Sequence, residues 1–143
     1  MKGLLISASA KSSGKTTVTM GLTAALARRR YIVQCYKKGP DYIDAMWLSH
    51  ASGRPCHNLD FFTSSHDEIV NAFAVAAAGA DLGLVEGNKG LFDGVDLEGR
   101  DSNAALAKLL GAPIVVVVDT RGMTRGIAPV LLGYQAFDED LTI

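Results

Sequence analysis

The residues best suited to chemistry lie near the start of the sequence, in the run Ser-Ala-Lys-Ser-Ser-Gly-Lys-Thr-Thr at positions 9–17. This run follows a short apolar segment and opens a helical pattern, the setting in which a Gly-Lys-Thr sequence cradles phosphates. Backbone N–H groups of such a loop can point inward, and we expect Lys15 to reach the β- and γ-phosphates of a nucleotide and the Thr16 hydroxyl to bind Mg²⁺. We therefore predict a P-loop that binds ATP and Mg²⁺. Its predicted cofactor-binding residues are Ser12, Ser13, Gly14, Lys15, Thr16 and Thr17.

Two positions set this loop apart from other P-loops. The strict pattern has glycine where this chain has Ser9. The partition and division-site ATPases carry a second lysine at the position of Ala10, whereas here the additional lysine is Lys11. A ParA/MinD-like ATPase switch that binds a protein partner is therefore an alternative that the spacing disfavours. A serine- and glycine-rich loop that only caps a helix is the other alternative.

A second polar group, Lys-Lys-Gly-Pro-Asp-Tyr-Ile-Asp, occupies positions 37–44 directly after an apolar run. A lysine at the carboxyl end of a parallel strand lies where such sheets bind ligands. Lys37 is therefore predicted to neutralise charge on a transferred phosphoryl group. Asp41 is predicted to bind Mg²⁺ directly or through water. The alternative is that these lysines and aspartates form a solvated turn.

A third group, Glu-Gly-Asn-Lys-Gly-Leu-Phe-Asp-Gly, occupies positions 86–94. Glu86 ends an apolar strand, where a carboxylate costs free energy unless it faces a cation or a ligand cleft. Thr16, Asp41 and Glu86 together supply the oxygen ligands of a Mg²⁺ site. Asp93 is a further catalytic candidate, in a glycine-bounded loop beyond Glu86. The alternative is a capping glutamate and a turn aspartate, and Asp119 is either an acid of the nucleotide site or a turn residue.

The elements that position these groups follow from the hydrophobic pattern. Short apolar runs alternate with helical patterns, which predicts an α/β fold of the P-loop NTPase-like class. Strands that are nearly continuous in Val, Ile and Leu indicate a mostly parallel sheet with helices on both faces. Predicted strands span residues 3–7, 32–36, 82–86 and 113–118, and predicted helices span residues 15–29, 43–52, 66–78, 103–110 and 126–135.

Length and composition limit the classes of function. The chain has 143 residues, which suits one domain, with 48% hydrophobic residues and a formal net charge of −1. Such a charge balance favours neither a nucleic-acid partner nor a membrane surface, and no apolar run approaches the ~20 residues of a membrane span. The apolar stretch that follows Lys2 is far shorter than that of a signal peptide. We therefore expect a cytoplasmic protein.

Taken together, these segments resemble the N-terminal ATP-binding domain of the cobyrinic acid a,c-diamide synthase family. The resemblance covers nearly the whole chain in order, and the Gly-Pro-Asp-Tyr-Ile-Asp block at positions 39–44 is its most specific part. The related dethiobiotin synthetases share the fold and the P-loop but not this block, so a dethiobiotin synthetase-like fold is implied. The matching segments are residues 13–19, 37–44, 53–55, 58–60, 86–87, 90–94 and 105–110.

The resemblance also implies a reaction. ATP phosphorylates a peripheral carboxylate of a tetrapyrrole, and ammonia then attacks the acyl phosphate to form an amide. Full-length family members take the ammonia from glutamine, using a C-terminal glutamine amidotransferase domain. By this resemblance Lys15 and Lys37 stabilise the phosphates, and Asp93 helps to position the activated carboxylate. The Mg²⁺ ligands are Thr16, Asp41 and Glu86.

The sequence departs from this family pattern in two respects. Asn88 and Lys89 stand where corrinoid enzymes usually have two apolar residues, and the run at positions 86–90 is similar to a branch associated with sulfur-oxidation gene clusters. That branch is thought to amidate sirohaem, which is therefore the alternative substrate. No amidotransferase nucleophile is evident in the sequence, and the adenine pocket is expected beyond residue 143. We expect residues 1–143 to be a truncated amidoligase domain, inactive with glutamine by itself, from a homodimeric protein; bicarbonate-dependent carboxylation is a further alternative.

Overall fold

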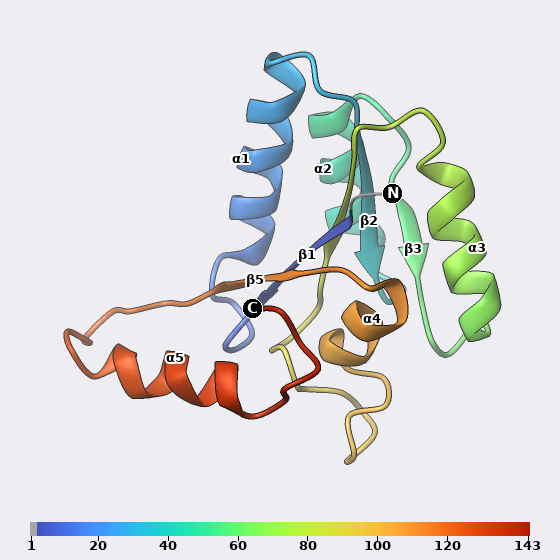
Figure 1. The fold of residues 1–143 in the computed structure, drawn as a ribbon. Helices are drawn as coiled ribbons and strands as arrows, with labels where there is room; N and C mark the ends of the chain where they lie inside the picture. Colours follow the sequence, from blue (N-terminus) through green and yellow to red (C-terminus); the bar gives the residue numbers. More distant parts are fainter. Residues whose placement is uncertain (1–2) are drawn as a thin grey trace.

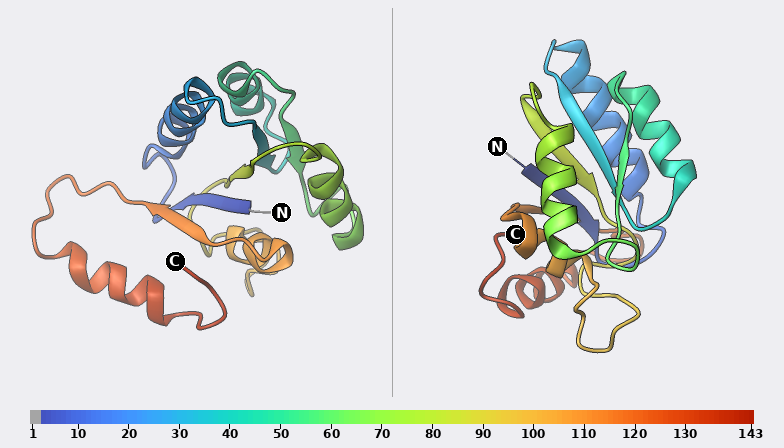
Figure 2. Two further views of the ribbon diagram at one scale, coloured as in Figure 1. Left: turned by 45° about the horizontal axis from the view of Figure 1, so that its top comes forward. Right: turned by 90° about the vertical axis from the view of Figure 1, so that its right-hand side faces the viewer.

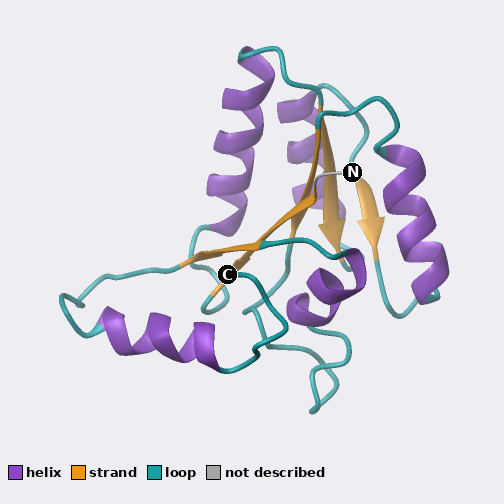
Figure 3. Ribbon diagram, in the orientation of Figure 1, coloured by secondary structure: helices purple, strands orange, loops and turns teal. Residues whose placement is uncertain are grey.

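The computed structural model describes residues 3–143, so Lys2 lies outside the described residues. Five strands in this range form one sheet, with the order β3-β2-β4-β1-β5 (Figures 1 and 3). Every neighbouring pair in it is parallel. The carboxyl ends of all the strands therefore meet at one edge of the sheet. The strands are β1 (Gly3–Ala8), β2 (Val33–Lys38), β3 (His57–Leu59), β4 (Leu82–Glu86) and β5 (Ile114–Val117).

Helices cover both faces of the sheet, as the two views in Figure 2 show. Helices α1 and α2 pack on one face, and α3 and α4 pack on the other. Helix α5 follows β5 at the edge of the sheet, where its Tyr134 packs against the core on the α3/α4 face. The helices are α1 (Lys15–Arg28), α2 (Tyr42–Ser52), α3 (His66–Ala76), α4 (Asn103–Leu110) and α5 (Ile127–Ala136).

Side-chain alternation along the strands divides the core into two clusters. Leu5 of β1 and Val85 of β4 belong to the cluster beneath α3 and α4. Their neighbours Ile6 and Leu84 belong to the cluster beneath α1 and α2. The same alternation directs consecutive side chains at the carboxyl ends of the strands to opposite faces, which decides where the polar residues of that edge lie.

Polar residues fix where several helices begin, because a helix leaves its first N–H groups without internal partners. The Asp41 carboxylate accepts hydrogen bonds from the backbone N–H groups of Ile43 and Asp44, each at 3.0 Å, and so caps α2. Ser102 caps α4 through the N–H of Ala105. Both caps stand at the carboxyl edge of the sheet, where they hold the loops that carry polar residues.

The structure confirms the predicted fold class: the sheet is parallel throughout, with helices on both faces. Each predicted strand and helix is present, with ends within two residues of the prediction. The sequence did not predict β3, because its three residues include the polar, exposed His57 and Asn58 and form no apolar run. Of the helices within residues 3–143, none has the length and apolar character to cross a membrane.

Candidate active site

The P-loop connects β1 to α1 and has the backbone form that phosphate binding requires. Ser12 has a φ of 63° and Gly14 a φ of 92°, so two positions adopt the left-handed conformation that turns successive N–H groups inward. A Cβ atom at Gly14 would meet no atom within 4 Å, so glycine is favoured there by backbone conformation rather than by lack of space. The Ser13 hydroxyl steadies the loop by donating to the carbonyl of Ala10 at 2.9 Å.

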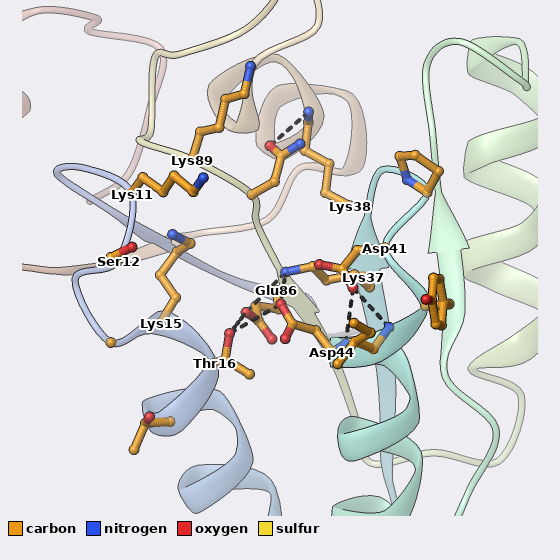
Figure 4. A pocket seen from close by; sticks show the side chains of 16 residues that line it. Lys11, Ser12, Lys15, Thr16, Lys37, Lys38, Asp41, Asp44, Glu86 and Lys89 are labelled. Atoms are coloured by element: carbon orange, nitrogen blue, oxygen red, sulfur yellow. Dashed lines mark hydrogen bonds and ion pairs between the residues drawn. The ribbon is translucent and has the colours of Figure 1, made fainter.

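Below the P-loop, four side chains from four elements meet (Figure 4). Lys37 and Glu86 are directly paired in the register of β2 and β4, and both side chains point to the α1/α2 face. The Lys37 ammonium donates to Glu86 Oε1 at 3.1 Å and to Asp44 Oδ2 at 2.8 Å. The Thr16 hydroxyl lies 2.6 Å from the same Glu86 oxygen and 3.3 Å from Asp44 Oδ2. We refer to Thr16, Lys37, Asp44 and Glu86 as the lysine–carboxylate network.

The electrostatics of this network follow from its burial. Glu86 is fully buried, and burial raises the pKa of its carboxyl above the ordinary value although Lys37 and Thr16 oppose the change. Burial also disfavours the charged form of Lys37, but the attraction of Glu86 and the bonds to Asp44 outweigh it and keep the Lys37 pKa above its usual range. Burial also disfavours the charged form of Asp44, but the contacts of Asp44 with Lys37 and Thr16 outweigh this effect and lower the pKa of Asp44.

Glu86 has one oxygen that the protein does not satisfy. Its Oε2 atom is buried and has no hydrogen-bond partner among the described residues. Leaving a buried carboxylate oxygen unpaired costs free energy, so this atom marks a position suited to a cation or a polar ligand. Hydroxyl and carboxylate oxygens from Thr16, Asp44 and Glu86 are ligands that Mg²⁺ prefers. No three His, Cys, Asp or Glu residues within positions 3–143 form a metal site by themselves, so phosphate or water oxygens would have to complete the coordination.

A cleft of about 770 Å³ opens over the network and the P-loop. Lys15 is buried beside it, and no hydrogen-bond partner of its ammonium is found within residues 3–143. Burial and the nearby charge of Lys37 lower the pKa of Lys15. The charged residues of the cleft are five lysines and three acids, so it favours a polyanionic ligand. They are Lys11, Lys15, Lys37, Lys38, Lys89, Asp41, Asp44 and Glu86.

The structure places the remaining predicted residues less centrally. Asp41 lines the cleft, but its carboxylate caps α2, and Asp44 is the aspartate that reaches Thr16 and Lys37. Asp93 is exposed and accepts a hydrogen bond from the N–H of Gly90 at 3.1 Å. Asp119 pairs with Arg121 in a separate hollow on the far side of the P-loop. The predicted cofactor-binding residues Ser12, Gly14, Lys15, Thr16 and Thr17 line the cleft itself.

Sequence reasoning missed the contribution of Asp44, although it lies in the block at positions 37–44. The available signal was its spacing: Asp44 follows the cap Asp41 by three residues, which places it in the first turn of α2 and near the end of β2. Asn103 was also missed. This fully buried amide donates to Ser7 Oγ at 3.0 Å and to the carbonyl of Gly90 at 2.9 Å, and it holds the loop that follows Glu86.

The sequence of the chain is similar to those of several known proteins, although no family model matches it. The chain is 54% identical over 140 residues to a protein named cobyrinate a,c-diamide synthase from Magnetococcus marinus. That alignment covers 98% of this chain and 30% of the relative. Proteins of the same name from Syntrophotalea carbinolica and Dehalococcoides mccartyi are 47% identical over 139 residues and 43% identical over 141 residues. These alignments cover 96% and 98% of this chain, respectively, and 30% of each relative.

The alignments extend over nearly the whole of this chain, which spans about 30% of the length of these relatives. The comparison therefore agrees with the resemblance inferred from the motifs. Over nearly its whole length, the chain is similar to a segment that makes up about 30% of the length of proteins named cobyrinate a,c-diamide synthase.

Proposed function

We propose that the protein takes part in the ATP- and Mg²⁺-dependent amidation of peripheral carboxylates of a tetrapyrrole. The observation that carries this proposal is the lysine–carboxylate network beneath the P-loop, with an unsatisfied buried oxygen on Glu86. The network opens into a lysine-rich cleft large enough for a nucleotide's phosphates and a second anion. The name shared by the relatives supports the choice of reaction.

In the proposed reaction, a carboxylate oxygen of the tetrapyrrole attacks the γ-phosphorus of ATP, and ADP leaves. Ammonia then attacks the acyl carbon, phosphate departs with the C–O bond electrons, and an amide remains. Phosphoryl transfer of this kind depends on positioning and charge neutralisation rather than on covalent help from the protein. The ammonia would come from glutamine hydrolysed by an amidotransferase domain of the natural polypeptide.

The chain's residues take distinct parts in this proposal. The P-loop N–H groups and the Lys15 ammonium bind the β- and γ-phosphates. Thr16, Asp44 and Glu86 would hold Mg²⁺, which when bound neutralises charge on the phosphates. Lys37 has three acceptors, Asp44, Glu86 and the carbonyl of Gly87, so its first role is to hold the two carboxylates together.

Three predicted roles fit less directly and remain proposals. Asp41 would influence the Mg²⁺ site through α2, since its cap fixes the turn that carries Asp44. Lys37 would contact a phosphoryl oxygen only by giving up one of its three present acceptors. Asp93, exposed at the turn that begins at Gly90, would act on the bound carboxylate rather than on the nucleotide.

The substrate is a corrinoid if this chain follows the name of its relatives, and sirohaem is the second candidate. The observation that favours sirohaem is the Asn88–Lys89 pair beside the cleft, in place of the two apolar residues usual in corrinoid enzymes. Both candidates are tetrapyrroles with several carboxylates, so the same site serves either.

The test uses the natural polypeptide that carries this sequence. It is incubated with ATP, Mg²⁺ and glutamine, and with ammonium chloride in a parallel reaction, with cobyrinic acid or with sirohaem. We expect tetrapyrrole-dependent ADP release and a product in which an amino group replaces a hydroxyl group, detected by mass spectrometry. ADP release that does not respond to either tetrapyrrole would overturn the proposal. ATP-dependent dimerisation without substrate would instead indicate a partner-binding switch, and a requirement for bicarbonate would indicate a carboxylase.

A further inference from the structure

Lys38 follows Lys37 in the sequence but has a different environment. Strand alternation turns its side chain to the α3/α4 face, and in Figure 4 its ammonium lies apart from the Lys37–Glu86 pair. Only 5% of Lys38 is exposed. Its ammonium donates to Asn88 Oδ1 at 3.2 Å and lies 5.8 Å from the centre of the Phe61 ring. An ammonium has three donors, so this arrangement leaves hydrogen-bonding capacity unused.

The nearest acids do not pair with Lys38 within the described residues. Asp60 and Asp101 favour its charge from a distance, but neither forms an ion pair with it. Asp60 accepts a hydrogen bond from the N–H of Phe62 at 3.2 Å. Asp101 accepts from the N–H groups of Val95 and Asp96 at 2.9 and 3.0 Å. These carboxylates organise loops, so Lys38 is a buried cation whose main partner is a neutral amide.

The partner of Lys38 is itself held in place. The N–H of Asn88 donates to Asn103 Oδ1 at 3.1 Å, and the Asn103 amide donates back to the carbonyl of Asn88. Asn103 is fully buried, which restricts its own movement. The backbone of Asn88 is therefore fixed. Its side-chain oxygen, which accepts from the Lys38 ammonium, sets the position of that ammonium.

Lys38 and Asn88 line the large cleft and also a smaller hollow of about 50 Å³ on the α3/α4 face. The P-loop and Lys15 border the cleft on the other side of the sheet edge. An anion that contacts both Lys15 and Lys38 would therefore have to extend across the carboxyl ends of β1, β4 and β2. A tetrapyrrole carries several carboxylates on its rim and meets this requirement.

We propose that Lys38, held by Asn88, binds a second carboxylate of the tetrapyrrole, distinct from the carboxylate that is phosphorylated. This inference rests on the proposed function, and it gives a supporting role in substrate binding to Asn88, one of the two residues at which the sequence departs from the corrinoid pattern. Lys38 lines the cleft and has donors that the described residues do not use. A carboxylate accepts from such donors with short, charge-assisted bonds.

The test compares Lys38→Met with Lys38→Arg in the natural polypeptide, and Lys108→Met serves as a charge-matched control. Lys108 lies on α4 and pairs with Asp138 at 2.7 Å, away from the cleft. We expect Lys38→Met to raise KM for the tetrapyrrole about ten-fold or more, as for the loss of a charged hydrogen bond, with KM for ATP and kcat nearly unchanged. Lys38→Arg should recover part of the loss, and the salt dependence of KM should weaken in Lys38→Met.

Other outcomes separate this inference from the proposed function. If the wild-type protein turns over a tetrapyrrole and Lys38→Met leaves its KM unchanged, this inference is wrong and the proposed function stands. A rise in KM for ATP alone would assign Lys38 to the phosphates and also overturn it. If the wild-type protein shows no turnover, the proposed function fails, and equilibrium binding of sirohaem without ATP still tests Lys38. Lys38→Gln and a thermal unfolding measurement distinguish weaker binding from poor folding.

Discussion

Lys37 and Lys38 are consecutive residues on one strand, yet their side chains have different environments on the two faces of the sheet. On the α1/α2 face, Lys37 contacts the carboxylates of Asp44 and Glu86. On the α3/α4 face, Lys38 contacts the amide of Asn88, and no carboxylate lies within ion-pair distance of it among residues 3–143. Both lysines are almost fully buried, so burial alone does not distinguish them.

The difference lies in how the charge is balanced. Around Lys37 the positive charge is matched within the protein, and the unsatisfied oxygen of Glu86 makes the α1/α2 face suited to a cation. Around Lys38 the neutral amides of Asn88 and Asn103 set positions without cancelling charge, which leaves that face suited to an anion. One sheet edge therefore offers adjacent sites of opposite preference, as the proposed reaction between a metal-bound nucleotide and a carboxylate would require.

The largest expected effect comes from removing each lysine in turn. Lys37→Met leaves Asp44 and Glu86 without their common cation, so we expect the free energy of unfolding to fall by about 3–5 kcal/mol. Lys38→Met removes a buried charge that has no ionic partner, so stability should stay the same or rise. Urea unfolding followed by circular dichroism measures both. Equal losses for the two variants would contradict the contrast between the faces.

The second effect concerns catalysis on the α1/α2 face. Glu86→Gln keeps the shape of the side chain but removes the charge, and if Glu86 holds Mg²⁺, kcat should fall by about 100-fold or more. The variant should be no less stable than the wild type near neutral pH, because burial disfavours the charged form of Glu86. Tetrapyrrole-dependent ADP release in the natural polypeptide measures kcat. Glu98→Gln, at an exposed loop position, is the control. An equal loss of kcat in that variant would contradict the proposal that Glu86 holds Mg²⁺.

These contrasts show which parts of the molecule the sequence could predict. The apolar runs predicted the parallel sheet, and the spacing of Gly14, Lys15 and Thr16 predicted the P-loop, because both depend on local patterns. The placement of Glu86 at a strand end likewise indicated that it faces the cleft. These signals act over a few residues.

The parts that could not be predicted depend on contacts between distant segments. Asp41 and Asp44 are both acids in one short block, and only the start of α2 decides that Asp41 caps the helix while Asp44 reaches Thr16. Asn103 lies 15 residues from Asn88 and 96 from Ser7 in the sequence, so nothing local indicates that it joins them. The separate roles of Lys37 and Lys38 likewise require the register of β2 with β4.

The third effect concerns the hydrogen bonds that join the Asn103 side chain to Asn88 and Gly90 on the α3/α4 face. Asn103→Ala leaves buried backbone groups of Asn88 and Gly90 without partners, so we expect a loss of about 1–3 kcal/mol in unfolding free energy. A Cβ atom at Gly87 would lie 2.7 Å from the Asn103 side chain. Gly87→Ala should therefore destabilise the wild-type protein more than it destabilises Asn103→Ala, a coupling that a double-mutant cycle measures. Additive losses of unfolding free energy would show that the Asn103 side chain does not clash with a Cβ atom at position 87.

The smallest effect is a pair of pH dependences of opposite sign within the network. The folded pKa of Asp44 is lowered below 3.8, so its stabilising contribution is present above that pH and is lost as the pH falls through the folded value. The destabilisation by Asp44→Asn should therefore shrink in acid. The folded pKa of Glu86 is raised above 4.5, so its contribution is present below that pH and is lost as the pH rises. The stability of Glu86→Gln relative to wild type should accordingly increase from pH 4 towards neutrality. Unfolding curves measured between about pH 3 and 7 compare the two variants, and slopes of the same sign would contradict the opposite shifts of the two carboxyl pKa values.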